Sequence, residues 1–166
     1  MTNHETDNQP QEIERKFLVD IKLLEGNPDD YEHATIRQGY LAIGEDGSEA
    51  RVRDKAGKYS LTVKTKGDLV RGEWETKLTK DQFETLWPAT EGKRVEKTRF
   101  KIPYGEYVVE LDVYEGDLEG LVSAEIEFED VHAAEQFEAP IWLGKDVTKE
   151  SAFKNQNLAC KGVPNE

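Results

Sequence analysis

The sequence of 166 residues contains one cysteine, Cys160, and three histidines. A single cysteine excludes an intramolecular disulfide and gives no sign of an oxidising compartment. The histidines His4, His33 and His132 stand at no spacing typical of zinc ligands, so no zinc site is expected. The sequence also has no long hydrophobic run, and its polar first segment does not resemble a signal peptide. These absences predict a cytoplasmic protein without a membrane span.

Basic residues are scarce, since 22 Lys and Arg face 35 Asp and Glu and leave a formal net charge of −13. A basic face is what nucleic acids and anionic membranes require, so neither is expected as a partner. A phosphate ligand would need a local basic pocket. Hydrophobic content is low at 36% and charged content is high at 34%, which indicates that some charges face inward.

A linker rich in proline, glycine or serine is missing as well, and the length suits one domain. We predict a flexible N-terminal segment over residues 1–11, one domain over 12–160 and a C-terminal tail over 161–166. The oligomeric state stays open, with a homodimer as one option.

From Ile13 onward the dominant hydrophobic period is two, which is typical of β-strands. The strands are expected near residues 12–19, 35–43, 49–55, 59–66, 71–78, 94–102, 107–115 and 121–129, separated by short turns such as Lys55-Ala56-Gly57-Lys58. Connections this short exclude parallel βαβ winding, and closure of eight strands would remove exposed edges. We therefore predict an all-β-dominated (α+β) fold: an eight-stranded antiparallel β-barrel tunnel with a polar lumen and a few short helices packed outside.

Three short helices are expected between or after the strands. Thr79 and Gln82 form a capping box sequence, and Pro88 ends the helix that follows. Asp130 can cap a second helix, and Thr148 a third.

Charged residues alternate with apolar ones on nearly every predicted strand, so that each strand has one charged face. The sets are Glu12, Glu14 and Lys16; Arg51 and Arg53; Lys64 and Lys66; Glu73 and Glu75; Lys97 and Arg99; Glu110 and Asp112; Glu125 and Glu127. For any one strand, the ordinary interpretation is a solvated sheet face. A solvated face needs no sorting by sign, yet here acidic and basic pairs segregate by strand. The sorting indicates a binding site.

The helices carrying Phe83 and Phe137 need apolar surface to cover, which favours apolar strand faces outward and charges in the lumen. Like charges about 4 Å apart repel by about 4 kcal/mol at an effective dielectric of 20, so an interior of this kind needs counter-ions. Hard divalent cations such as Mg²⁺ or Mn²⁺ suit the carboxylates, and an anion with several charges suits the arginines and lysines. The simplest such anion is a polyphosphate.

The segment Glu12-Ile13-Glu14-Arg15-Lys16 resembles the ExExK signature of the CYTH superfamily, the triphosphate tunnel metalloenzymes. The resemblance extends from about residue 12 to residue 160, because the charged pairs follow in the order typical of that family. Two further segments, Arg37-Gln38-Gly39-Tyr40-Leu41 and Leu86-Trp87-Pro88-Ala89-Thr90-Glu91-Gly92, are similar to the short bacterial members that hydrolyse inorganic tripolyphosphate.

The resemblance implies a metal-dependent inorganic triphosphatase with a polyphosphate substrate and Mg²⁺ or Mn²⁺ as cofactor. It implies that the triphosphate is bound by Lys16, Arg51, Arg53, Lys64, Lys97, Arg99 and Lys154. It implies a metal set of Glu12, Glu14, Glu110, Asp112, Glu125 and Glu127. Catalytic roles fall to Lys16, Tyr40, Glu73 and Glu75, with Tyr40 paired to Lys16. The division of labour among Glu73, Glu75, Glu110 and Asp112 stays open.

In the implied mechanism a carboxylate-oriented water attacks the terminal phosphoryl group in line, and the products are phosphate and pyrophosphate. Two kinds of alternative remain. One is another activity of the same superfamily: thiamine triphosphatase, nucleoside triphosphatase or class IV adenylate cyclase. The other is a polyphosphate-binding module without catalysis, which the many acidic pairs disfavour because simple anion binding needs no metal-recruiting carboxylates.

Overall fold

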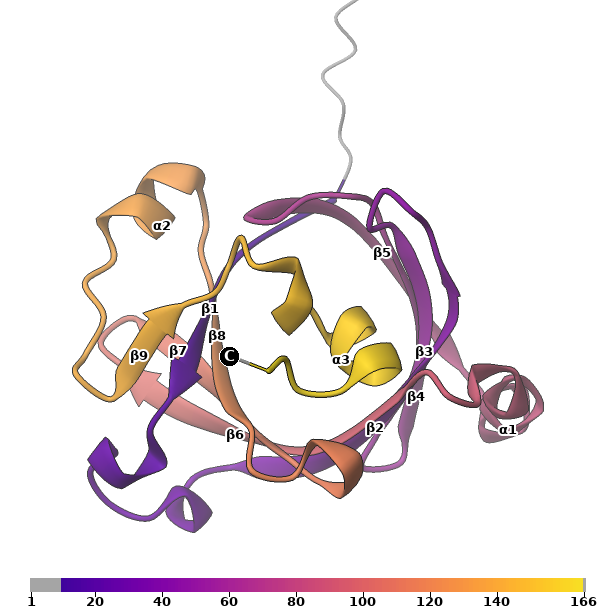
Figure 1. Ribbon diagram of the computed structural model, residues 1–166, viewed down its shortest axis with the longest axis horizontal. Helices are drawn as coiled ribbons and strands as arrows, with labels where there is room; N and C mark the ends of the chain where they lie inside the picture. The colour runs from indigo at the N-terminus through magenta and orange to yellow at the C-terminus, as the bar shows by residue number, and fades with distance from the viewer. Residues whose placement is uncertain (1–9, 166) are drawn as a thin grey trace, which may run out of the picture.

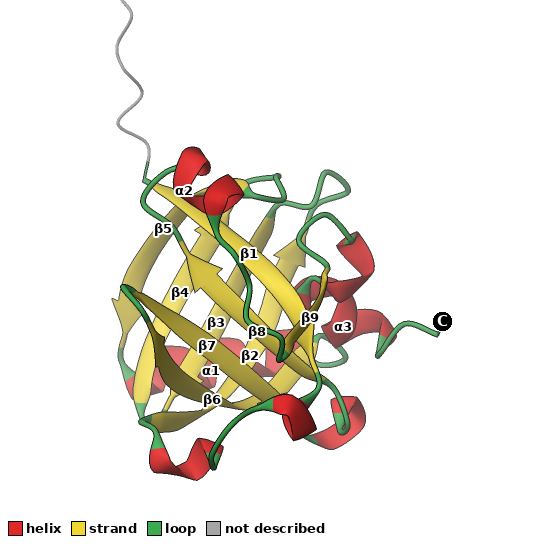
Figure 2. Ribbon diagram, turned by 90° about the vertical axis from the view of Figure 1, so that its left-hand side faces the viewer, coloured by secondary structure: helices red, strands yellow, loops and turns green. Residues whose placement is uncertain are grey.

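The computed structural model describes residues 10–165, in which eight strands form one closed antiparallel barrel (Figures 1 and 2). They are β1 (Gln11–Val19), β2 (His33–Ile43), β3 (Glu49–Lys55), β4 (Lys58–Lys64), β5 (Val70–Leu78), β6 (Arg94–Tyr104), β7 (Tyr107–Tyr114) and β8 (Val122–Glu127). The order around the barrel is β5-β4-β3-β2-β6-β7-β8-β1, and pairing of β1 with β5 closes it. The predicted barrel is confirmed, with most strand bounds within two residues of the prediction.

A ninth strand, β9 (Leu143–Asp146), pairs with β1 and lies outside the barrel. The sequence analysis missed it because four residues are too few to show an alternating pattern. Gln11 begins β1 and Lys161 ends the last helix, and the predicted division into 1–11, 12–160 and 161–166 stays a prediction. Residues 1–9 and 166, which belong to the predicted terminal segments, lie outside the described residues.

The largest hydrophobic core lies on the outer surface of the barrel. Outward-facing side chains of β1, β6, β7 and β8 pack beneath helix α2 (Val131–Gln136) and β9; they include Phe17, Phe100, Val109, Leu111, Ala124 and Ile126. Asp130 caps α2 as predicted, accepting a hydrogen bond from the backbone N–H of Ala133. The expected arrangement, apolar faces outward and charged faces inward, is therefore present.

A second helix, α1 (Lys80–Leu86), covers the opposite part of the wall (Figure 1). The predicted capping box is confirmed, because the Thr79 hydroxyl accepts from Gln82 N–H and the Gln82 side chain accepts from Thr79 N–H. Phe83 is fully buried between Tyr59 of β4 and Trp87, each ring 5.1 Å away. Trp87 begins a short 3₁₀ helix, η3 (Trp87–Thr90).

The third helix, α3 (Asn155–Lys161), lies across one end of the barrel (Figures 1 and 2). The predicted cap at Thr148 is wrong, because Lys154 occupies the N-cap position of α3. The Thr148 hydroxyl is used elsewhere: it accepts from Lys16 N–H and donates to Asp146. Thr148 therefore ties the C-terminal segment to β1.

Four other 3₁₀ helices complete the described chain: η1 (Ile21–Leu23), η2 (Pro28–Asp30), η4 (Gly116–Leu118) and η5 (Ser151–Phe153). Among the helices of residues 10–165, none has the length and apolar character needed to span a bilayer.

The contact between α1 and the barrel gives a stability prediction. Phe83→Ala should lower the free energy of unfolding by about 3–5 kcal/mol, because it leaves a cavity under a fully buried aromatic ring. Val63→Ala, on the same outer face but 42% exposed, should cost less than about 1 kcal/mol and serves as the control. Urea denaturation of both variants measures the difference, and equal losses would contradict the role assigned to α1.

Candidate active site

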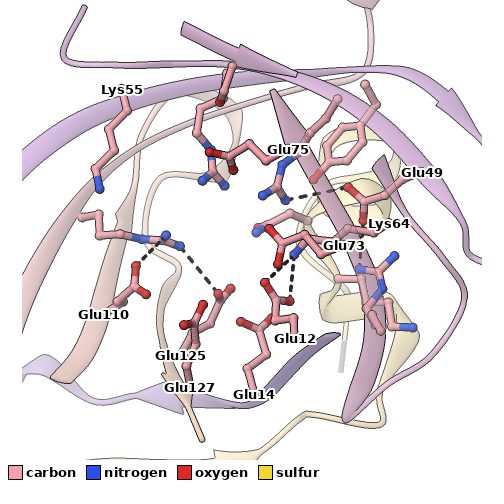
Figure 3. A pocket seen from close by; sticks show the side chains of 18 of the residues that line it. Glu12, Glu14, Glu49, Lys55, Lys64, Glu73, Glu75, Glu110, Glu125 and Glu127 are labelled. Carbon is pink, nitrogen blue, oxygen red and sulfur yellow. Dashed lines mark hydrogen bonds and ion pairs between the residues drawn. The ribbon is translucent and has the colours of Figure 1, made fainter. Parts of the chain in front are cut away.

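A cavity of about 690 Å³ occupies the barrel interior (Figure 3). The structure brings nearly all predicted site residues to its wall: Glu12, Glu14, Lys16, Tyr40, Arg51, Arg53, Lys64, Glu73, Glu75, Arg99, Glu110, Glu125, Glu127 and Lys154. Lys97 and Asp112 are the exceptions, because their side chains are fully buried and do not line the cavity. Strand geometry explains the collection, because residues two apart on each strand share the inner face.

Three carboxylates gather on the β1 and β8 side of the cavity. Glu12, Glu14 and Glu127 each offer an oxygen within 4.8 Å of the other two. Burial and the neighbouring Glu125 raise the pKa of Glu14 well above its usual value, and burial and Glu110 raise the pKa of Glu127. Carboxylates under such repulsion take up a proton or a cation, and three hard oxygen donors fit Mg²⁺ or Mn²⁺. The donor chemistry therefore suits the expected metal.

Glu12 also contacts one group from β4 and one from β5, the strand that pairs with β1. The Lys64 ammonium donates to both of its oxygens, at 2.8 and 3.1 Å. Burial opposes ionisation of Glu12, but Lys64 and a hydrogen bond from Glu73 outweigh it, and the pKa of Glu12 is lowered. Burial and the same hydrogen bond raise the pKa of Glu73 to about 7. Glu73 is therefore the proton-carrying partner of this carboxyl pair near neutral pH.

Two arginines of β3, Arg51 and Arg53, face the cavity, and among the described residues neither donates a hydrogen bond to a carboxylate. The Arg51 guanidinium lies 3.7 Å from Glu49, and its buried Nε has no hydrogen-bond partner among the described residues. Arg53 donates to the Gln38 side-chain oxygen at 2.8 and 3.0 Å. Burial, followed by the charges of Arg51 and Arg99, lowers the pKa of Arg53 to about 10. A buried cation destabilised by other cations is a favourable place for an anion.

Arg99 of β6 is held from several sides. It donates to both Asp112 oxygens, at 2.8 and 2.9 Å, and lies 2.7 Å from Glu110. Behind it, the Lys97 ammonium donates to Asp112 at 2.8 Å. Burial lowers the pKa of Lys97 to about 7 even though Asp112 opposes this shift. In this structure Lys97 contacts Asp112, and Arg99 alone of the two reaches the cavity.

Lys16 and Tyr40 do not form the predicted pair. The Lys16 ammonium donates to the backbone carbonyl of Phe153 at 2.6 Å and lies 3.9 Å from Glu125. The Tyr40 hydroxyl accepts from the Gln38 side-chain amide at 3.1 Å. Burial and Glu49 raise the pKa of Tyr40 above its usual range, so the hydroxyl stays protonated. The C-terminal segment, whose fold the sequence pattern did not predict, takes the place beside Lys16.

The same segment supplies Lys154, which donates to the Gly67 carbonyl and to Asp68, both at 2.8 Å. Asn155 at the start of α3 accepts from the Tyr114 hydroxyl at 2.6 Å. Both residues line the cavity, so α3 closes the end at which they lie.

Sequence analysis missed several inward-facing charges: Glu49, Lys55, Lys58, Arg71 and Lys77. All have the strand parity of the residues that it did assign, so extending each alternating set along its strand, by two residues in most cases and by six for Lys58, would have found them. Arg71 and Glu49 form an ion pair of 3.0 Å across the cavity wall.

The sequence and structure were compared with known proteins. A model of the CYTH domain matches residues 10–158. An inorganic triphosphatase from Nitrosomonas europaea is 46% identical over 151 residues, which cover 89% of this chain and 96% of that protein. One from Acetivibrio thermocellus is 36% identical over 154 residues, covering 89% and 92%. A crystal structure of an inorganic triphosphatase, 41% identical, superposes with a TM-score of 0.66 and covers 90% of this chain and 94% of the other.

The buried Lys97–Asp112 pair gives a second stability prediction. Asp112→Asn should lower the free energy of unfolding by about 3–5 kcal/mol, because it leaves the two buried cations Lys97 and Arg99 without their shared carboxylate. The double variant Lys97→Met/Asp112→Asn should be more stable than the sum of the single losses predicts, because it removes charges of both signs. Guanidinium denaturation of Asp112→Asn, of Lys97→Met and of the double variant completes the cycle. Additive losses would show that the pair is not coupled.

Proposed function

The chain belongs to the CYTH domain family, and from that premise we propose that it hydrolyses inorganic tripolyphosphate to pyrophosphate and phosphate inside the barrel. The observation that carries this proposal is the division of one cavity into two chemistries. Arginines and lysines of β3, β4 and β6 face a carboxylate cluster on β1 and β8. A linear polyanion that also binds cations matches both sides at once.

Phosphate oxygens are the proposed partners of Lys16, Arg51, Arg53, Lys64, Arg99 and Lys154. Arg51 supports this most directly, since its buried Nε lacks a partner and a guanidinium fork matches phosphate geometry. Lys97 was predicted among these ligands by resemblance. In our proposal Lys97 acts through Asp112 and orients Arg99 instead, because the Asp112 carboxylate accepts hydrogen bonds from both Lys97 and Arg99.

Glu12, Glu14 and Glu127 would hold Mg²⁺ or Mn²⁺, with Glu125 and Glu110 beside them. When bound, the cation supplies positive charge to phosphoryl oxygens and to the leaving pyrophosphate. Glu125 lies 3.6 Å from Arg99 and Glu110 lies closer still, so these two carboxylates also orient the guanidinium that faces the substrate. Asp112, predicted as a metal ligand by resemblance, is engaged by Lys97 and Arg99.

Glu73 and Glu75 are the proposed residues that orient the attacking water. They lie two residues apart on the inner face of β5, next to the carboxylate cluster through the Glu12–Glu73 contact. Tyr40 contributes a protonated hydroxyl beside Arg51, where it can donate to a phosphate oxygen. The enclosing barrel keeps bulk water away from the chain of phosphates, which strengthens each of these interactions. The cytoplasmic location expected from the single cysteine belongs to this proposal, as does a small-molecule polyphosphate as the substrate; the oligomeric state stays open.

Phosphate release from several substrates tests the proposed reaction. Tripolyphosphate should be hydrolysed with Mg²⁺ or Mn²⁺ and not with EDTA, because the carboxylate cluster needs a cation beside a polyanion. ATP should show a lower kcat/KM at matched free Mg²⁺, since the charged wall offers a nucleobase little to stack on. Undiminished turnover in EDTA would exclude the metal role, and ATP as the better substrate would exclude the substrate assignment.

Arg51 gives a residue-level test. Arg51→Gln should lower kcat/KM for tripolyphosphate at least ~10-fold, given about 1.5–3 kcal/mol for a hydrogen bond to a charged group. Arg37→Gln is the matched control, because Arg37 lies outside the barrel over the Phe83 and Trp87 rings and removes the same charge. Initial rates across substrate concentration measure both variants. A loss of similar size in the control would mean that overall charge, and not the site, governs activity.

A further inference from the structure

Two segments that carry the family resemblance, residues 37–41 and 86–92, meet on the outer side of β2. Gly39 packs so closely against Thr90 that a Cβ at position 39 would lie 2.4 Å from the Thr90 side chain, and glycine is therefore required there. The next N–H along the strand, that of Tyr40, donates to the carbonyl of the residue before β6 at 2.9 Å. The register of β2 against β3 shifts directly after Tyr40, as at a β-bulge. These contacts fix the β2 backbone at the point from which two side chains enter the barrel.

The two inward side chains at this point are Gln38 and Tyr40, which are two residues apart and share the inner face. Gln38 pairs across the sheet with Arg53, and Tyr40 pairs with Arg51. The Gln38 side-chain oxygen accepts from Arg53 at 2.8 and 3.0 Å, and its nitrogen lies 3.1 Å from the Tyr40 hydroxyl oxygen. Gln38 is fully buried and does not line the cavity, whereas Tyr40 and both arginines do. Any influence of Gln38 on a ligand therefore passes through its neighbours.

Hydrogen-bond chemistry fixes how the Gln38 amide is turned. A guanidinium offers only donors, so the amide atom that faces Arg53 must be the oxygen. The NH₂ group then faces Tyr40, and the phenolic oxygen has to accept. The proton of that hydroxyl is directed away from Gln38, because an amide NH₂ offers no acceptor. Burial and the charge of Glu49 raise the pKa of Tyr40, so the proton is present to be donated.

The Tyr40 proton is free to meet a ligand. Among residues 10–165 the Tyr40 hydroxyl accepts from Gln38 and donates no hydrogen bond, and the side chain lines the cavity. An acceptor that enters the cavity, such as a phosphate oxygen, can therefore take this hydrogen bond without breaking another.

Gln38 also holds Arg53 without neutralising it. The amide oxygen accepts from Nε and from one terminal nitrogen, which fixes the plane of the guanidinium and leaves its remaining N–H groups for other acceptors. The ion pairs of residues 10–165 do not include Arg53. Burial and the charge of Arg51 lower the pKa of Arg53, as expected for a cation that no carboxylate balances. A glutamate in place of Gln38 would pair with Arg53 and weaken its attraction for an anion.

We propose that Gln38 is a positioning residue of the site: it makes the Tyr40 hydroxyl a donor toward the substrate phosphate and presents Arg53 as an oriented cation. The inference rests on the proposed function of the same cavity. A neutral amide serves both partners at once, because it offers an acceptor to the guanidinium and a donor to the hydroxyl. Glutamate lacks the donor, and methionine, of similar size, lacks both groups. Substitution can therefore separate the two contacts.

The first test is Gln38→Glu, which should lower kcat for tripolyphosphate at least ~10-fold, because the carboxylate draws the Tyr40 proton away from the substrate. It should also raise KM, because it neutralises Arg53. In a Tyr40→Phe background the same substitution should raise KM alike but change kcat less than ~3-fold, since no hydroxyl proton remains to divert. Initial rates of phosphate release by the four proteins give both parameters. Equal kcat losses in the two backgrounds would overturn the inference.

Gln38→Met distinguishes positioning from structural support. A merely structural role makes Gln38→Met the more harmful change, since it removes the Arg53 contact that Gln38→Glu keeps. Positioning gives the reverse order for kcat, because Gln38→Met leaves the Tyr40 proton free and Gln38→Glu captures it. A lower kcat for Gln38→Met than for Gln38→Glu would contradict the inference. If Gln38→Glu does not fold, the kcat loss of Gln38→Met decides, and it should shrink in the Tyr40→Phe background.

The matched control is Gln136→Glu, which adds the same charge at an exposed glutamine of α2, outside the barrel. It should keep kcat and KM within ~2-fold of wild type, because salt screens exposed charges at this distance. A loss as large as that of Gln38→Glu would mean that overall charge governs the rate, and the inference would fall.

Fluorine NMR of protein labelled with 3-fluorotyrosine gives a readout that needs no turnover. Tyr40 is one of six tyrosines, and its signal is the one missing from Tyr40→Phe. In the free protein Gln38→Glu should shift that signal, since the hydroxyl changes from acceptor to donor, and Gln136→Glu should not. An unmoved signal would overturn the inference whether or not phosphate is released. A moved signal without phosphate release from tripolyphosphate by the wild type would instead refute the proposed function and leave the hydrogen-bond assignment in place.

Discussion

Charge inside a closed barrel is the constraint on which the rest of this structure depends. Each ionised group removed from water needs a partner, because desolvation costs more than a single contact returns. The protein meets this requirement with linked pairs: Lys64 with Glu12, Arg71 with Glu49, and Arg99 with Asp112 and Glu110. The pairing is incomplete at Arg51, at Arg53 and at the carboxylate cluster. These groups suit ligands of opposite charge: an anion at the arginines and a cation at the carboxylates.

A polar interior also decides where the hydrophobic core must lie. The strands bury their apolar faces outward, so the segments after β5 and β8 have to return and cover them. The helix α1 and the α2–β9 segment are therefore needed for folding, because they cover apolar surface that would otherwise be exposed to water. Arg15 links the two layers, since its guanidinium bonds to Asp146 and to the Ala134 carbonyl while lying 4.9 Å from the Phe17 ring. With the hydrophobic core outside the barrel, the interior is free to hold the charged side chains that line the cavity.

Strand parity explains why so much of this arrangement was predictable. A residue such as Glu12 or Arg51 points to the same side as its neighbours two positions away, so one correct orientation assigns a whole strand. Strand parity does not predict whether an inward-facing side chain lines the cavity or is buried among its neighbours. Lys97 has the parity of Arg99, yet it does not line the cavity, because it is fully buried against Asp112 and the Tyr114 ring. Contacts made by irregular segments, such as Phe153 with Lys16, carried no periodic signal and were missed for that reason.

Closure of the barrel by β1 has a consequence for how the chain reaches its native state. The first strand pairs with β5 through its beginning and with β8 through its remainder, so its neighbours are separated from it by roughly sixty and more than one hundred residues. Pairings so distant in sequence have a high loop-closure entropy, which slows folding. During synthesis β1 therefore stays unpaired, with Phe17 uncovered, until almost the whole chain has left the ribosome. The charged face of that strand lowers the risk of aggregation during this time, because Glu12, Glu14 and Lys16 disfavour pairing of the unpaired strand with another chain.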